Sequence, residues 1–168
     1  WQQMRVIEYF NQTPVIQFME PLVEADDVIS YVKASAMFST WQKVIVSADK
    51  DFIQLCNENT VLYRPIQKKI LNSKRVVETY GVHPQNFALA RAICGDKSDN
   101  LSGVGGIGLP TVAKRLPFLA EDKFYTIDEV VEYCSTVESG VRAYSKIVEN
   151  RDVVEHNYKM MQLSSPSI

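Results

Sequence analysis

The sequence predicts an α/β protein in which a sheet core flanked by helices is followed by a lobe made of helices. The apolar, β-branched run 44–47 is typical of a buried strand. Just before it, Val28, Tyr31 and Val32 recur with helical spacing, which predicts a helix. The segments expected beyond residue 72 are all helical, and they predict the second lobe.

The core elements follow from local signals. Pro21 and the acidic residues after it are helix-start signals, so a helix is expected over 22–38. A turn around Pro65 is expected to join two strands of a hairpin. In chain order we expect a helix over 1–13, a strand over 14–18, a helix over 22–38, a strand over 43–47, a short helix over 51–56, and hairpin strands over 60–63 and 69–71.

Beyond residue 72 the expected elements are all helices. They are expected over 73–80, 84–94, 110–116, 127–135 and 141–151. Ser73 and Thr126 are the expected N-caps, because a hydroxyl can accept a hydrogen bond from a free backbone N–H. The Ser/Pro-rich tail from Ser164 is expected to fray.

Composition indicates an intracellular, cytoplasmic protein without a membrane partner. Hydrophobic residues make up 46% of the 168 residues, yet no apolar run approaches the roughly 18 residues that span a membrane. No signal peptide is visible. Cys56, Cys94 and Cys134 are odd in number and widely spaced, so we interpret them as reduced core thiols.

The run from Gly95 to Gly108 joins two kinds of chemistry. Asp96 and Asp99 would lie one helical turn apart, as in a metal site. The glycines that follow form a Gly-x-Gly-x-x-Gly-like hairpin whose bare backbone can approach a phosphate. A dinucleotide site would need a strand before the glycines, whereas 84–94 has helical spacing. A glycine-rich turn without a ligand is the alternative.

Two further acidic clusters lie upstream. Glu24, Asp26 and Asp27 open the helix expected over 22–38, where acidic residues alternatively complement the helix dipole. Asp49 and Asp51 follow the strand 43–47, at the edge where open α/β sheets bind ligands. The alternative is a polar turn in which Asp51 caps the next helix.

Taken together, the three clusters predict a divalent-metal site. Seven converging carboxylates would repel one another strongly unless a cation neutralised them. Because all the ligands are oxygens, Mg²⁺ or Mn²⁺ is expected, and two ions about 3.5–4 Å apart would suit phosphodiester hydrolysis. The expected ligands are Glu24, Asp26, Asp27, Asp49, Asp51, Asp96 and Asp99.

These motifs resemble the 5′ nuclease family, which includes bacteriophage 5′–3′ exonucleases, flap endonucleases and the 5′ nuclease domain of bacterial DNA polymerase I. The matching segments are 24–27, 46–52, 95–100 and 103–108, in the family's order and spacing. The resemblance implies a PIN-like sheet core followed by a lobe with a helix-hairpin-helix motif. It also implies a two-metal, structure-selective nuclease that acts on 5′ flaps, nicked or gapped duplexes, or RNA paired to DNA.

The resemblance assigns roles to individual residues. Glu24 and Asp26 would belong to the first metal site, with Asp27 acting through water. Asp49, Asp51, Asp96 and Asp99 would hold or orient the second ion. A K⁺ ion on the hairpin carbonyls is a further implication. The implied DNA-binding residues are Gly103, Val104, Gly105, Gly106, Ile107, Gly108, Thr111 and Lys114.

The chain also departs from the family pattern. Leu109 and Pro110 stand where the family usually has a lysine, which removes one phosphate contact. The family's N-terminal strand, its two aspartates and its basic arch are not found before Glu24. We therefore expect the C-terminal part of the nuclease core over 1–94 and the DNA-binding lobe over 95–168. Another chain would supply the remainder if the enzyme is split.

Other function classes stay open at this point. A catalytically incomplete fragment would bind duplex DNA without cutting it. A metal-dependent phosphatase would also use an Asp-x-Asp sequence after a strand, but it leaves the glycine hairpin unexplained. Replication proteins are expected partners by resemblance alone, and a viral chain would work in the host cytoplasm.

Overall fold

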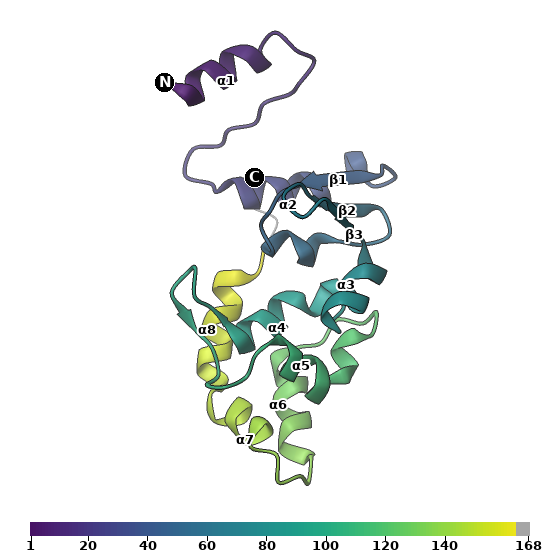
Figure 1. The fold of residues 1–168 in the computed structure, drawn as a ribbon, viewed down its shortest axis with the longest axis vertical. Coiled ribbons are helices and arrows are strands. Elements are labelled where there is room, and N and C mark those ends of the chain that lie inside the picture. Colours follow the sequence, from purple (N-terminus) through teal and green to yellow (C-terminus); the bar gives the residue numbers. More distant parts are fainter. Residues whose placement is uncertain (164–168) are drawn as a thin grey trace.

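The computed structural model describes residues 1–163 (Figure 1). The expected tail from Ser164 lies outside them. The strands are β1 (Lys43–Val46), β2 (Thr60–Arg64), β3 (Lys69–Leu71), β4 (Gly95–Asp96) and β5 (Leu101–Ser102). The helices are α1 (Gln2–Phe10), α2 (Ala25–Ala34), α3 (Ser73–Tyr80), α4 (Phe87–Cys94), α5 (Leu109–Arg115), α6 (Ile127–Thr136), α7 (Arg142–Glu149) and α8 (Arg151–Met161).

A small mixed sheet lies between the N-terminal segment and the helical part of the molecule (Figure 1). β2 pairs parallel with β1 and antiparallel with β3, which confirms the expected hairpin. Ile45, Leu62 and Leu71 stand opposite one another across the three strands and are buried. The expected α/β class is confirmed, and β1 ends next to the acidic segment that follows it.

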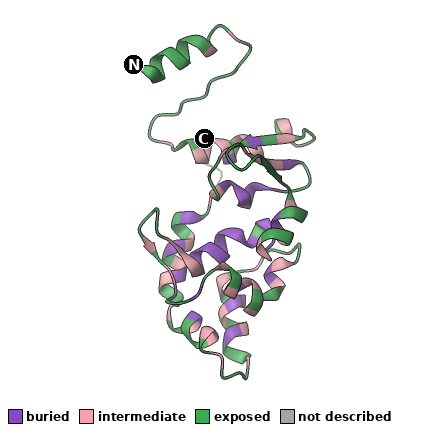
Figure 2. Cartoon of the chain, in the orientation of Figure 1, coloured by how far each residue is buried: buried purple, intermediate pink, exposed green. Residues whose placement is uncertain are grey.

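Helix α4 is the centre of the helical lobe. All of its residues from Phe87 to Ile93 are buried, and α8 and α5 pack against it (Figures 1 and 2). The expected N-cap Thr126 is confirmed by a capping box with Glu129. The N-cap of α3 was assigned wrongly to Ser73. Asn72 holds that position, and its Oδ1 accepts a hydrogen bond of 2.9 Å from the Arg75 amide.

The N-terminal segment lies apart from this body. α1 contains no buried residue and is joined to α2 by an extended stretch (Figures 1 and 2). The strand predicted over 14–18 is wrong, since this stretch is irregular. Pro14 lacks a backbone N–H for a sheet, and Gln17 donates a side-chain hydrogen bond back to Asn11 at 2.8 Å.

Two further expectations need correction. The helix predicted over 22–38 is shorter, because the extended ψ of Ser35 ends α2 and a short 3₁₀ turn (Ala36–Phe38) follows. Helix α8, which begins directly at the Asn150 junction after α7, was not predicted from the sequence.

Among the described residues, no helix is both long and apolar enough to cross a membrane.

Candidate metal centre and nucleic-acid interface

The first carboxylates stand in the tight segment after β1. The Asp49 amide donates to Ser47 Oγ at 3.0 Å, and the Asp51 amide donates to Asp49 Oδ1 at 2.9 Å. The capping role considered for Asp51 is wrong, because Lys50 is the N-cap of the 3₁₀ helix Asp51–Leu55 and makes no side-chain cap there, while Asp49 accepts from the first helical amide. This frees the Asp51 side chain to face α4.

Arg91 of α4 is the residue that joins the acidic clusters. Its guanidinium pairs with Asp51 Oδ1 at 2.8 Å and also with Asp96 Oδ2. Only 11% of the Arg91 side chain is exposed, against 21% for Asp51 and 19% for Asp96. The sequence reading missed Arg91. Its signal was a single cation on a helix that is otherwise apolar from Phe87 to Cys94.

Asp96 and Asp99 do not lie on a helix, so the predicted helical-turn spacing is wrong. β4 and β5 pair antiparallel, with Gly95 opposite Ser102, and both aspartates belong to this hairpin and its turn. The Ser98 amide donates to Asp96 Oδ1 at 2.7 Å, and the Ser98 hydroxyl donates to the same oxygen. The hairpin thereby orients Asp96 toward Arg91.

The cluster at the start of α2 faces the same region through Asp26. Burial raises the pKa of Asp26, and the negative charges of Asp49, Glu24 and Asp27 raise it further. Glu24 occupies the N-cap position, and its side chain makes no capping hydrogen bond there.

The pKa of Asp51 is also raised by burial and by nearby carboxylates, as is that of Asp26. Burial raises the Asp51 pKa, Arg91 opposes the rise, and Asp49, Asp99 and Asp26 reinforce it. Negative charge therefore gathers near the carboxyl end of β1, and Arg91 offsets part of it.

These side chains surround a cavity of about 270 Å³, lined by Ala48, Asp49, Lys50, Asp51, Arg91, Asp96, Ser98 and Asp99. Within residues 1–163, no three His, Cys, Asp or Glu side chains are grouped closely enough to hold one ion. Arg91 instead supplies the positive charge, because its guanidinium binds Asp51 and Asp96. Oxygen donors of this kind suit Mg²⁺ or Mn²⁺. In this structure, however, the carboxylates are spaced too far apart to share one ion, and Arg91 balances two of their charges.

The glycine hairpin is anchored from beneath by two buried side chains. Val104 is 2% exposed and Ile107 is 5% exposed. The Val104 amide donates to the Ile93 carbonyl at 2.8 Å, and the Ile107 amide donates to the Val104 carbonyl at 3.0 Å. Gly103 packs directly on the backbone of Cys94, where a Cβ would stand 2.1 Å from the carbonyl carbon.

The other three hairpin glycines form an exposed backbone surface. A Cβ on Gly105 would meet nothing within 4 Å, and Gly106 has a φ of +80° that favours glycine. Gly108 is the N-cap of α5, and Lys114 lies exposed in the last turn of that helix. Thr111 is half-buried in its first turn. The exposed backbone of Gly105, Gly106 and Gly108 is what a phosphate could approach.

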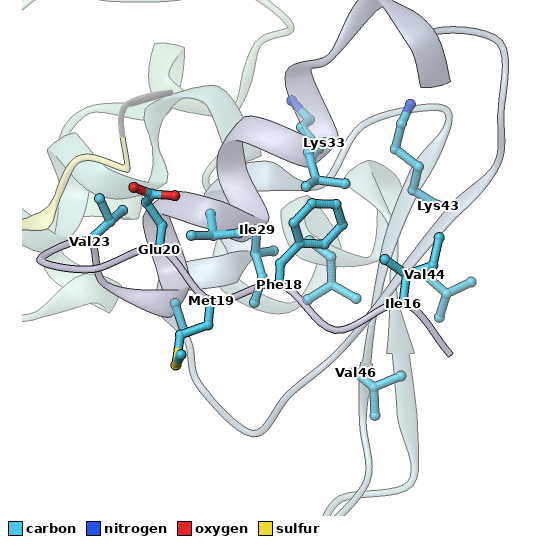
Figure 3. A pocket seen from close by; sticks show the side chains of 14 residues that line it. Ile16, Phe18, Met19, Glu20, Val23, Ile29, Lys33, Lys43, Val44 and Val46 are labelled. Atoms are coloured by element: carbon cyan, nitrogen blue, oxygen red, sulfur yellow. The ribbon is translucent and has the colours of Figure 1, made fainter. Parts of the chain in front are cut away.

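A larger and apolar groove of about 560 Å³ lies elsewhere (Figure 3). It runs between the segment carrying Phe18 and Met19, Ile29 of α2, and the valines of β1. Val44 is 58% exposed and Val46 is 64% exposed, and β1 is an edge strand of the described three-stranded sheet. None of the seven predicted ligands lines this groove, so it is not the metal centre.

Comparison with solved structures defines the class of fold. Two structures of the T5 D15 flap endonuclease, one with metal ions and one with DNA and metal ions, align with TM-scores of 0.78 and 0.76. Each alignment covers 96% of this chain and 58% of the T5 chain, at 16% identity. By fold, the chain is thus an α/β protein of the T5 5′-exonuclease type.

Sequence comparison identifies similar proteins. Residues 1–81 match the model of the 5′-3′ exonuclease N-terminal resolvase-like domain. A 5′-3′ exonuclease of Aquifex aeolicus is 29% identical over 96% of this chain and 53% of its own length. The flap endonuclease Xni of Shewanella sp. MR-4 is 28% identical over 94% of this chain and 58% of its own length. The chain is thus similar to 5′-3′ exonucleases and flap endonucleases, and it spans about half the length of these relatives.

Proposed function

We propose that the chain works as a structure-selective, divalent-metal-dependent 5′ nuclease that hydrolyses phosphodiester bonds. The observation that carries this proposal is the gathering of Asp49, Asp51, Asp96 and Asp99 around one cavity at the carboxyl end of β1. Relatives named 5′-3′ exonuclease and flap endonuclease support the reaction class.

To hold the second ion, Asp49, Asp51, Asp96 and Asp99 would have to draw closer together around the cavity they line, while Glu24, Asp26 and Asp27 would serve the first. Bound Mg²⁺ or Mn²⁺ would supply an acidified water as nucleophile and would stabilise the leaving oxygen. The chain's own contribution is orientation. Arg91 fixes one oxygen each of Asp51 and Asp96, and Ser98 fixes the other oxygen of Asp96.

The exposed hairpin backbone at Gly105, Gly106 and Gly108, with Thr111 and Lys114, would hold the duplex through its phosphates. Such contacts read duplex shape and not base sequence. The proposed substrates are 5′ flaps, nicked or gapped duplexes, and RNA primers paired to DNA. The related T5 flap endonuclease was crystallised with DNA and metal ions, which supports this choice.

A second candidate function is duplex binding without cleavage. It is favoured by the absence, within the described part of the chain, of any three carboxylates grouped for one ion.

Cleavage of a 5′-labelled flap duplex in Mg²⁺ separates the two candidates. The proposal expects cutting by the 168-residue chain and a loss of about 100-fold or more in Asp49→Asn, since one lost ligand costs several kcal/mol of charge stabilisation. Glu138→Gln is the matched control, because this exposed carboxylate lies in the loop between α6 and α7. Salt-sensitive duplex binding without any cutting would instead establish the second candidate.

A further inference from the structure

The family resemblance implies a K⁺ ion held by hairpin carbonyls, and the hairpin of this chain does not fit one well. The carbonyls of Val104 and Gly108 already accept backbone hydrogen bonds of 2.8–3.0 Å. The Ser102 carbonyl accepts 2.9 Å from Asn157 Nδ2. The carbonyl of Gly105, on the exposed side of the hairpin, also accepts a hydrogen bond, and its donor is a cation from another helix.

That cation is the ammonium group of Lys146 on α7. Its Nζ donates to the Gly105 carbonyl at 2.7 Å, across 41 residues of sequence. The same Nζ lies 3.7 Å from where a Cβ of Gly106 would stand, so it touches the hairpin at its left-handed turn. The positive charge therefore stands beside the exposed backbone that would meet a phosphate.

Helix α7 holds Lys146 in this position. The adjacent Ile147 is 1% exposed and anchors the helix in the core. One turn earlier, Tyr144 Oη donates to the Arg115 carbonyl at 3.3 Å, which fixes α7 against the end of α5. Lys146 is thus carried by an element that contacts both the hairpin and the helix that follows it.

We propose that Lys146 is the hairpin's built-in cation, taking the place of a free K⁺ ion and fixing the Gly105–Gly106 turn for phosphate binding. The ammonium has three donors, and Gly105 uses one. The other donors and the charge are available to a phosphate on the same surface. The inference rests on the proposed duplex binding by this lobe, and it assigns Lys146 as a positioning and phosphate-contacting residue.

The first test measures duplex affinity by fluorescence anisotropy in KCl, NaCl and tetramethylammonium chloride at one ionic strength. For the unaltered chain we expect the three dissociation constants to agree within about two-fold. The reason is that the cation beside the hairpin is Lys146, which belongs to the chain itself and does not depend on the salt. Lys146→Met should bind more weakly, with a log–log salt slope smaller by about 0.9, and K⁺ should partly restore its affinity. Lys159→Met, which removes an exposed lysine of α8, is the matched control and should retain the original salt slope to within experimental error.

The second test needs no DNA and measures hydrogen exchange of the Gly106 and Ile107 amides. Loss of one ordinary hydrogen bond at Gly105 should speed their exchange about five-fold in Lys146→Met, and K⁺ should leave the unaltered chain unchanged. Duplex binding by the unaltered chain that is several-fold tighter in K⁺ than in tetramethylammonium would overturn the inference, as would unaltered exchange in Lys146→Met. Failure of the unaltered chain to bind duplex in every salt would instead refute the proposed function, while the exchange test would still decide the role of Lys146.

Discussion

At the scale of single residues, the site is organised by one buried cation among several carboxylates. Arg91 binds Asp51 and Asp96 from a helix that is otherwise apolar, and it opposes the rise in the pKa of Asp51 that burial causes. A buried charge is costly unless it is paired, and removing one partner leaves the others uncompensated. Arg91 therefore stabilises the acidic cluster as long as no metal ion does so.

Replacing Arg91 by methionine should destabilise the protein most when divalent ions are absent. We expect a loss of about 3 kcal/mol in the free energy of unfolding in EDTA, because Asp51 and Asp96 then lack a counter-charge. Mg²⁺ should raise the melting temperature of Arg91→Met by more than that of the unaltered chain. Arg75→Met, at an exposed arginine that donates to the Ile70 carbonyl at 3.0 Å, controls for loss of a positive charge. An equal or smaller Mg²⁺ response in Arg91→Met would contradict this account.

At the scale of elements, the sequence predicted those whose signals are local. The β-branched run before Asp49 predicted β1, and the turn at Pro65 predicted the β2–β3 hairpin. The hydroxyl of Thr126 predicted the start of α6. The strand over 14–18 was wrong because pairing depends on a partner strand, which no local pattern contains. The carboxylate clusters were likewise visible in the sequence, whereas Arg91 was not, because its role depends on α4 packing against the 3₁₀ helix Asp51–Leu55.

α8 shows why long-range packing escapes such a reading. Its partner is α4, more than fifty positions earlier in the sequence. Asn157, which is 2% exposed, donates through Nδ2 to the carbonyls of Ala92 and Ser102, each at 2.9 Å. One side chain of α8 thus ties the end of α4 to the hairpin that carries Asp96.

Asn157→Ala should therefore loosen the Asp96 hairpin as well as the helix pair. Two carbonyls would lose their donor in the core, and we expect a loss of about 2–3 kcal/mol in the free energy of unfolding, measured by urea denaturation. Hydrogen exchange of the Ser98 amide should also become faster, because the base of its hairpin is released. His156→Ala, at the exposed neighbouring position, is the control for altering α8. If exchange at Ser98 stays unchanged, Asn157 does not hold the Asp96 hairpin in place.

At the scale of the whole molecule, the acidic residues outnumber the basic ones by two. The net charge is −2, although the proposed substrate is a polyanion. The seven predicted metal ligands account for this balance, since without them 18 basic residues face 13 acidic ones. Their mutual repulsion is a cost that the metal-free chain carries, and a bound divalent ion would remove it. Stability and function should therefore respond in opposite directions when one of these carboxylates is neutralised.

The pH dependence of stability tests this opposition at Asp26, whose pKa in the folded chain lies above its ordinary value of 3.8 because of burial and the nearby carboxylates. The folded state then binds more protons than the unfolded state between these two pKa values, so this group's contribution to stability falls as pH rises through that window.

In EDTA at pH 7, Asp26→Asn should melt about 1–2 °C above the unaltered chain, and the difference should vanish as the pH is lowered toward 4. In Mg²⁺ at pH 7 the order of the two melting temperatures should reverse. The unaltered chain would bind the ion more tightly, because the variant lacks the Asp26 carboxylate as a ligand, and tighter binding stabilises the folded state more. Scanning calorimetry of both chains, with and without Mg²⁺, measures all four values. A variant that melts below the unaltered chain in EDTA at pH 7 would show that Asp26 stabilises the metal-free fold, and the acidic cluster would then have to be structural.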